Sequence, residues 1–203
     1  MRWPKNIGQA WQLAGWPDRM QARGFSAESV AVWKFDKSPA IEQLLVRPAT
    51  SFRFSRAYLR SLFVPPPKPD VVILKECSSY FPGDLAVYQN SVRTWVDQLQ
   101  AHRIKVVLAT VVPVTKVRAQ RDPGKQESLL AYNRWVRQYA LQEGIPVVDL
   151  EASLRPEGEG GYLRDEFAAE DGSHLIAPAY AALDYTLFTT LCAQIPGAAC
   201  LAR

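Results

Sequence analysis

The chain has 203 residues, the length of a single domain, and we interpret residues 1–203 as one. Hydrophobic residues make up 48% and charged residues 22%, an ordinary globular mixture that excludes a disordered tail, a collagen-like repeat and a coiled coil. The net charge is +4, and residues 1–69 carry 11 basic and 4 acidic side chains. A general nucleic-acid binder needs a denser basic stripe, so we expect no nucleic-acid partner.

Targeting and cofactor signals are absent from the sequence. No run of 18 apolar residues occurs, and no apolar stretch follows the first residues, so we predict neither a membrane-spanning helix nor a signal peptide. The three cysteines and two histidines show no spacing typical of a zinc site, so we expect no metal and no organic cofactor. The compartment and the oligomeric state stay open.

The first third of the chain gives weak signals. Residues 12–23 and 52–63 favour helices, and residues 29–33 favour a strand. Residues 1–64 therefore remain poorly defined, whereas residues 65–195 give a clear pattern.

Three short runs rich in apolar, mostly β-branched residues predict strands buried on both faces. They lie at residues 71–74, 105–109 and 145–149. Helical patterns separate them, and strands that alternate with helices at this spacing are typical of a parallel sheet covered by helices. Because the connections of such units are right-handed, the sequence predicts a three-layer α/β/α sandwich.

The helices are predicted from apolar residues at three- and four-residue spacing. One helix follows the capping acid Asp84, a second ends at Gly144, and a last one begins near Pro178. Residues 113–124 are predicted to be a loop, and so are residues 151–171, whose many acids indicate exposure to solvent.

Asp171 and His174 are the most informative polar pair. In open parallel sheets ligands bind beyond the carboxyl ends of the strands. The pattern places this pair there, at the start of the last helix, where residues three apart share a face. A carboxylate in contact with an imidazole fixes its tautomer and leaves the other ring nitrogen free as a base. The spacing alone favours the simpler alternative, a capping Asp beside a surface His.

The stretch from Tyr132 to Tyr180 resembles the C-terminal part of the SGNH (GDSL-type) hydrolases. The resemblance rests on residues 132–133, 144–150, 171–174 and 179–180, and from Pro69 onward it covers about two thirds of the chain. It implies a flavodoxin-like fold and ester hydrolysis or acyl transfer by a serine, on a small-molecule or carbohydrate ester. It also implies that Asp171 orients His174 and that His174 is the general base.

The family's nucleophile block, Gly-Asp-Ser, does not occur in this sequence, and residues 8–10 are the nearest string. Residues 16–20 resemble the family's first helix, which lies beyond that serine. We therefore expect the first strand and its serine to be absent from the chain as written, either because it is a fragment or because its start is assigned too late. The alternative is a pseudoenzyme that binds a carbohydrate or acyl group without turnover.

The family's third block, Gly-x-Asn-Asp, is replaced by residues 76–79, which read Glu-Cys-Ser-Ser. We predict that Ser78 and Ser79 supply oxyanion donors, although turn residues need no such role. Cys77 is interpreted as a small buried structural cysteine in preference to a thiolate nucleophile, because only Lys75 adds a nearby positive charge. Glu76 is interpreted as an ionised loop residue.

Overall fold

The computed structural model describes residues 35–45, 69, 71–155 and 161–194. The helices predicted at residues 12–23 and 52–63, the strand predicted at residues 29–33 and the string at residues 8–10 lie outside this part of the chain.

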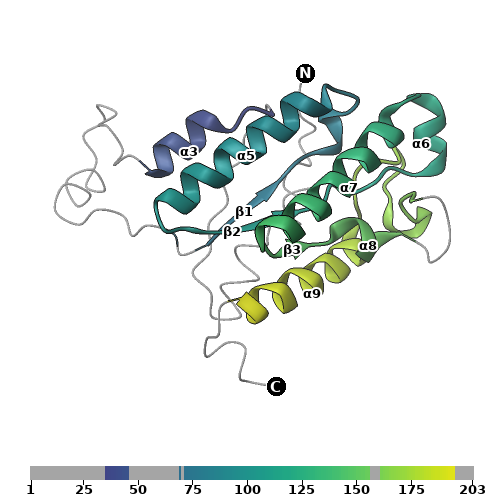
Figure 1. Ribbon diagram of the computed structural model, residues 1–203. Helices are drawn as coiled ribbons and strands as arrows, with labels where there is room; N and C mark the ends of the chain where they lie inside the picture. The colour runs from purple at the N-terminus through teal and green to yellow at the C-terminus, as the bar shows by residue number, and fades with distance from the viewer. Residues whose placement is uncertain (1–34, 46–68, 70, 156–160, 195–203) are drawn as a thin grey trace, which may run out of the picture.

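The described strands form one parallel sheet. Its order is β1 (Val71–Lys75), β2 (Lys105–Ala109) and β3 (Val147–Val148), with Val71 opposite Lys105 and Leu108 opposite Val147. All three strands lie within or beside the predicted runs, although β3 is shorter than residues 145–149. The predicted parallel sheet is confirmed (Figure 1).

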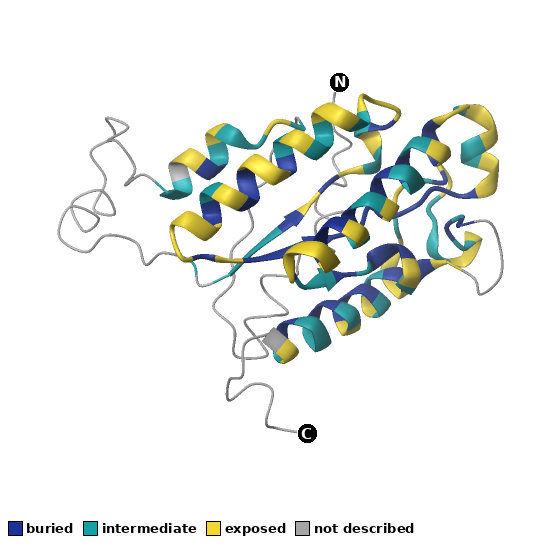
Figure 2. Cartoon of the chain, viewed as in Figure 1, coloured by how far each residue is buried: buried dark blue, intermediate teal, exposed yellow. Residues whose placement is uncertain are grey.

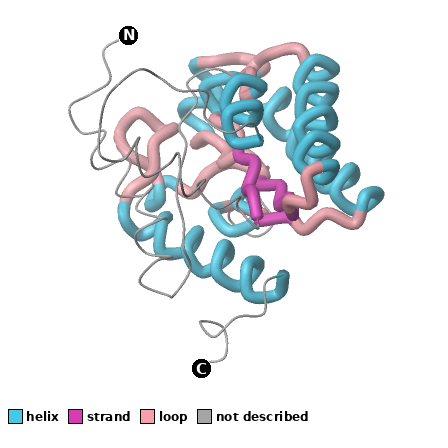
Figure 3. Tube along the Cα trace, turned by 90° about the vertical axis from the view of Figure 1, so that its left-hand side faces the viewer, coloured by secondary structure: helices cyan, strands magenta, loops and turns pink. Residues whose placement is uncertain are grey.

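Helices cover both faces of this sheet. Because side chains alternate along a strand, Val106 and Leu108 of β2 face one core, and Val107 and Ala109 face the other. The first core also contains residues of α3 (Ser38–Leu45), α5 (Leu85–Ala101) and α7 (Lys125–Glu143), and the second contains residues of α8 (Leu150–Leu154) and α9 (Ala177–Gln194). Figure 3 shows the strands between these two groups of helices, as the α/β/α prediction requires.

The long helices begin and end where the sequence indicates. The Asp84 side chain accepts hydrogen bonds from Ala86 N at 2.9 Å and Val87 N at 3.2 Å, and so caps α5. Gly144 ends α7 in the left-handed conformation, with φ at 64°. Buried residues form one stripe on each helix and exposed residues the opposite one, as Figure 2 shows.

Two predicted loops contain helices. Residues 113–124 include α6 (Lys116–Arg121), which begins because the Thr115 hydroxyl accepts a hydrogen bond from Arg118 N. Residues 151–171 include most of α8 and the 3₁₀ helix η2 (Asp165–Phe167). The prediction of a fully solvated loop is wrong there, since Leu154 and Leu163 are buried in the second core. Within the described ranges, no helix is long and apolar enough to span a membrane.

Candidate active site

Asp171 and His174 are in contact. One carboxylate oxygen of Asp171, Oδ2, is paired with His174 Nδ1. The other, Oδ1, accepts hydrogen bonds from Ser173 N at 3.0 Å and His174 N at 2.9 Å. The carboxylate therefore fixes both the backbone and the ring of His174.

These contacts also determine the charge of Asp171 and the tautomer of His174. Partial burial raises the pKa of Asp171, but the hydrogen bonds from the backbone N–H groups of His174 and Ser173, and from the ring, outweigh it and leave the pKa below its usual range. An ionised carboxylate only accepts hydrogen bonds, so Nδ1 carries the proton. The Nε2 atom has no hydrogen-bond partner among the described residues, and the side chain is 56% exposed. A base with this geometry is open to a substrate.

The pair does not lie on a helix, contrary to the sequence prediction. Asp171 and His174 stand in a tight turn, and α9 begins only at Ala177. The turn closes a short antiparallel contact between Ala168 and Leu175, and Gly172 adopts a φ of 69°. The spacing of three brings the two side chains together because Asp171 caps the turn, not because they share a helix face.

The turn is attached to the segment that follows β2. Thr115 N donates a hydrogen bond of 2.9 Å to Gly172 O. A Cβ atom at Gly172 would lie 2.5 Å from Thr115 Oγ1 and 2.9 Å from Arg118 Cβ, so only glycine fits this contact. His174 therefore lies beyond the carboxyl end of the sheet, where parallel sheets bind ligands.

The predicted oxyanion residues lie beyond the carboxyl end of β1. Ser78 and Ser79 belong to the 3₁₀ helix η1 (Ser78–Tyr80), which has no side-chain cap at Cys77. Ser79 Oγ donates to Cys77 Sγ at 3.1 Å. In the described part of the chain, neither serine forms a hydrogen bond with His174. The role of these serines stays a prediction.

One interpretation of the neighbouring residues is wrong, and another is incomplete. Cys77 is an exposed free thiol, not a buried structural cysteine. Glu76 is buried, with 2% of its side chain exposed, and its carboxylate pairs with Lys37 Nζ. Burial raises the pKa of Glu76, and the ammonium of Lys37 only partly opposes this shift. No local pattern predicts this pair, because its members lie 39 positions apart.

Lys37 fits this place because aromatic rings surround its ammonium group. Its Nζ lies 5.4 Å from the ring centre of Phe35, 5.5 Å from that of Tyr80 and 5.4 Å from that of Trp95. The pair connects the segment before α3 with the segment between β1 and η1.

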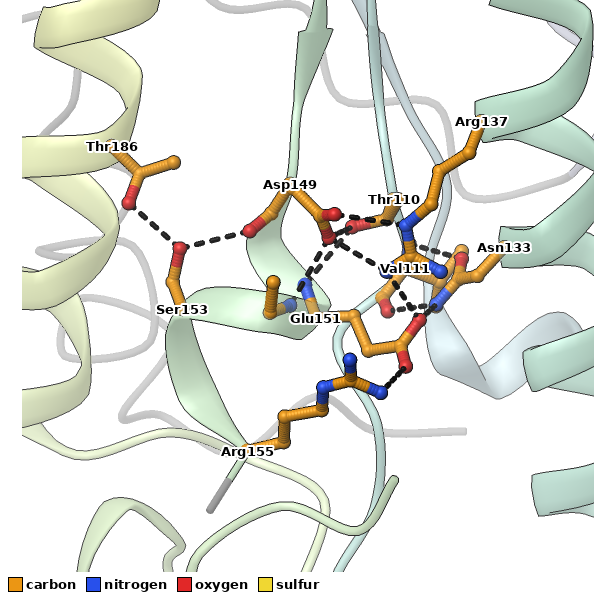
Figure 4. Close-up of polar contacts among 10 residues, drawn as sticks. Thr110, Val111, Asn133, Arg137, Asp149, Glu151, Ser153, Arg155 and Thr186 are labelled. Atoms are coloured by element: carbon orange, nitrogen blue, oxygen red, sulfur yellow. Dashed lines mark hydrogen bonds and ion pairs between the residues drawn. The ribbon is translucent and has the colours of Figure 1, made fainter. Parts of the chain in front are cut away.

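A larger polar network lies beyond β2 and β3 (Figure 4). Arg137 of α7 donates through Nε and Nη2 to both oxygens of Asp149, each at 2.8 Å, and through Nη2 to Glu151 Oε2 at 2.8 Å. Although partial burial raises the pKa of Asp149, the hydrogen bond from Arg137 and those from Ala152 N and Thr110 leave it below its usual range. Glu151 has 2% of its side chain exposed, and Arg155 pairs with its other oxygen.

Asn133 connects this network to the backbone. Its side chain accepts from Val111 N at 2.7 Å and donates to Val111 O at 2.7 Å and to Glu151 Oε2 at 2.9 Å. Sequence reasoning missed this role. The signal was present, because Asn133 stands four residues after Leu129 on the apolar face of α7, where a polar side chain needs a buried partner.

Metal ligands do not gather in the described ranges. No three His, Cys, Asp or Glu side chains there lie close enough together to hold a metal ion.

Comparisons with known proteins identify relatives. The sequence model of the GDSL-like Lipase/Acylhydrolase family matches residues 11–182. No curated protein matches the chain significantly.

Solved structures share the fold at low identity. A GDSL-like lipase from Bacteroides thetaiotaomicron VPI-5482 is 15% identical, with a TM-score of 0.63 over 91% of this chain and 85% of that one. A carbohydrate acetylesterase from Sinorhizobium meliloti is 14% identical, with a TM-score of 0.50 over 83% of this chain and 90% of that one. A G-D-S-L family protein from Desulfitobacterium hafniense DCB-2 is 17% identical, with a TM-score of 0.52, and the match spans 61% of this chain and 66% of that one.

Proposed function

Since this chain belongs to the GDSL-like lipase/acylhydrolase family, we propose that it acts through Asp171 and His174 on a small-molecule or carbohydrate ester. One observation carries this proposal. The Asp171 carboxylate holds Nδ1 of His174, and no described residue occupies Nε2 of the same ring, the atom that would take a proton. A surface histidine beside a cap would not need its ring to be held in this way.

The proposed chemistry is ester hydrolysis or acyl transfer. As a hydroxyl attacks the ester carbonyl, His174 Nε2 takes its proton, and the ring then gives this proton to the leaving alkoxide. Water or an acceptor alcohol then attacks the ester formed with that first hydroxyl, while His174 Nε2 takes its proton. The ring gives this proton to the first hydroxyl oxygen as its bond to the acyl carbon breaks. Asp171 stabilises the imidazolium formed in between.

The carbonyl oxygen becomes negatively charged during this attack. We assign its stabilisation to backbone N–H groups at the start of η1, near Ser78 and Ser79. The absence of a side-chain cap at Cys77 supports this assignment, because the first N–H groups of a helix otherwise need a partner.

The nucleophile limits the rate. In this family it is the serine of a Gly-Asp-Ser block, which these 203 residues do not contain. We therefore propose that the chain as written hydrolyses esters slowly. A second candidate function, binding of a carbohydrate or acyl group without turnover, is favoured by the replacement of the third block by residues 76–79.

Hydrolysis of p-nitrophenyl acetate tests the proposal. We expect slow turnover that falls by about tenfold or more in H174A, because general acid–base catalysis contributes at least this much. The control is H102A, since His102 caps the C-terminus of α5 just before β2, at the opposite end of the strands from His174, with its Nδ1 2.8 Å from Gln98 O. Equal rates in H174A and H102A would contradict the proposed function. Stabilisation by an acetylated sugar without any turnover would favour the binding module.

A further inference from the structure

The segment Thr110–Thr115 after β2 is buried without being a strand or a helix. All six residues are buried, and Thr110, Val111 and Val114 have 0% of their surface exposed. Buried backbone groups outside regular structure need hydrogen-bond partners. The identity of these partners shows what holds the segment in place.

On one side of the segment the partners are two buried amide side chains of α7. Asn133 binds both Val111 N and Val111 O, as a neighbouring strand would (Figure 4). Gln126 accepts from Val114 N at 3.4 Å, and its Nε2 donates to Gly161 O at 2.6 Å. Two side chains that α7 holds rigidly therefore determine the course of the segment.

On the other side the segment is hydrogen-bonded to the turn that contains His174, the proposed base. Val114 O accepts from Leu163 N at 3.0 Å, and Thr115 N donates to Gly172 O at 2.9 Å. Gly172 lies between Asp171 and Ser173, and Asp171 holds both the backbone and the ring of His174. A continuous set of hydrogen bonds thus leads from α7 to the imidazole.

We propose that Gln126 and Asn133 are positioning residues for His174, which they hold in place through Val111, Val114 and Thr115. Neither amide touches the ring. The proposal rests on the proposed function only for the role of His174 as a base. The position of its ring is a structural property that does not depend on catalysis. An imidazole that must take a proton from one direction needs such a rigid support.

The tautomer of His174 reports on its position without any need for turnover. The chain has two histidines, so ¹⁵N spectra of histidine-labelled protein give two sets of ring signals, and His102 is an internal reference. In the unchanged protein we expect His174 with its proton on Nδ1. Because this readout does not require catalysis, a failed esterase assay leaves the test intact.

The first comparison is Gln126→Met against Gln138→Met. Both change the same residue type on α7, but Gln126 is buried against the segment and Gln138 is exposed. We expect Q126M to raise the population of the Nε2–H tautomer of His174 at least twofold, with His102 unchanged and with no effect in Q138M. A merely structural role for Gln126 would lower the melting temperature and leave the His174 signals as in Q138M, and this result would overturn the proposal.

The second comparison is Thr115→Pro against Thr115→Val. Both lose the hydroxyl that caps α6, but only proline loses the N–H that binds Gly172 O. Thr115 has a φ of −63°, which proline adopts without strain. We expect a raised population of the Nε2–H tautomer of His174 in T115P and not in T115V. Equal spectra in the two variants would overturn the proposed connection from Thr115 N to Gly172 O. If T115P does not fold, the Gln126 pair still decides the proposal.

Discussion

The carboxyl ends of β1 and β3 both bury a carboxylate, but they do so in different ways. Beyond β1, Glu76 pairs with Lys37 alone among the described residues, and within the same ranges its buried Oε1 atom has no hydrogen-bond partner. Beyond β3, Glu151 accepts from Asn133, Arg137 and Arg155 together. One end has a minimal ion pair and the other a network in which both oxygens of the buried carboxylate are bonded.

The two ends therefore differ in how many groups hold the buried carboxylate. A buried charge with several partners is stable in fewer geometries than one with a single partner. At the β1 end, where the chain departs from the family's third block, the buried carboxylate depends on one lysine. We expect the loss of a buried amide at the β2–β3 end to cost more than the loss of this lysine, and a substitution that keeps the charge at the β2–β3 end to cost least.

The largest effect is expected for Asn133→Leu. Leucine leaves Val111 N and Val111 O unpaired in a buried place, which costs roughly 4 kcal/mol of unfolding free energy for the two groups together. Urea unfolding followed by circular dichroism measures this loss. Asn90→Leu on the exposed face of α5 is the control and is expected to change the free energy by about 0.5 kcal/mol at most. A loss below about 1 kcal/mol in N133L would contradict the importance of these hydrogen bonds.

Lys37→Met breaks the pair at the β1 end. It leaves a buried carboxylate without its cation, and we expect a loss of about 3 kcal/mol at pH 7. The pKa of Glu76 is already raised in the folded protein, so protonation favours the folded state, and this contribution is lost as the pH rises. The penalty of K37M is therefore expected to shrink toward pH 4. A pH-independent penalty in urea unfolding, or an equal one in K116M, where the lysine is exposed, would exclude this explanation.

Arg137→Lys is expected to have the smallest effect. Lysine keeps the charge but cannot bond both oxygens of Asp149, and because both partners are about one third exposed we expect a loss of only about 1.5 kcal/mol. The lowered pKa of Asp149 stabilises the fold above the unfolded value, and this contribution disappears as the pH falls through the native one. The difference between R137K and the exposed control R134K should thus begin to shrink below about pH 4 and vanish once the pH is below the native pKa of Asp149. If it is the same at about pH 2 as at about pH 7, Asp149 is not its source.

The sequence predicted the elements that local chemistry determines. The β-branched runs led to β1 and β2, and Asp84 and Gly144 gave the ends of helices. The short helix α8 was missed because five residues give too few turns for a periodic pattern.

The candidate site was predictable only where its residues are neighbours in the sequence. Asp171 and His174 could be paired from their spacing, although the turn that joins them was mistaken for a helix. The contacts of Glu76 with Lys37, and of Asn133 with Val111, join residues 39 and 22 positions apart. Tertiary packing alone brings such residues together. The place of Asn133 on the apolar face of α7 indicates that it needs a buried partner, but no local pattern identifies Val111 as that partner.

The exposed thiol of Cys77 has a practical consequence. It lies directly beyond β1, beside Ser79, and among the described residues it is the one free cysteine. A maleimide dye coupled to this sulfur would stand beyond the carboxyl end of β1. Its fluorescence would report the arrival of a small molecule even if no bond were ever cleaved.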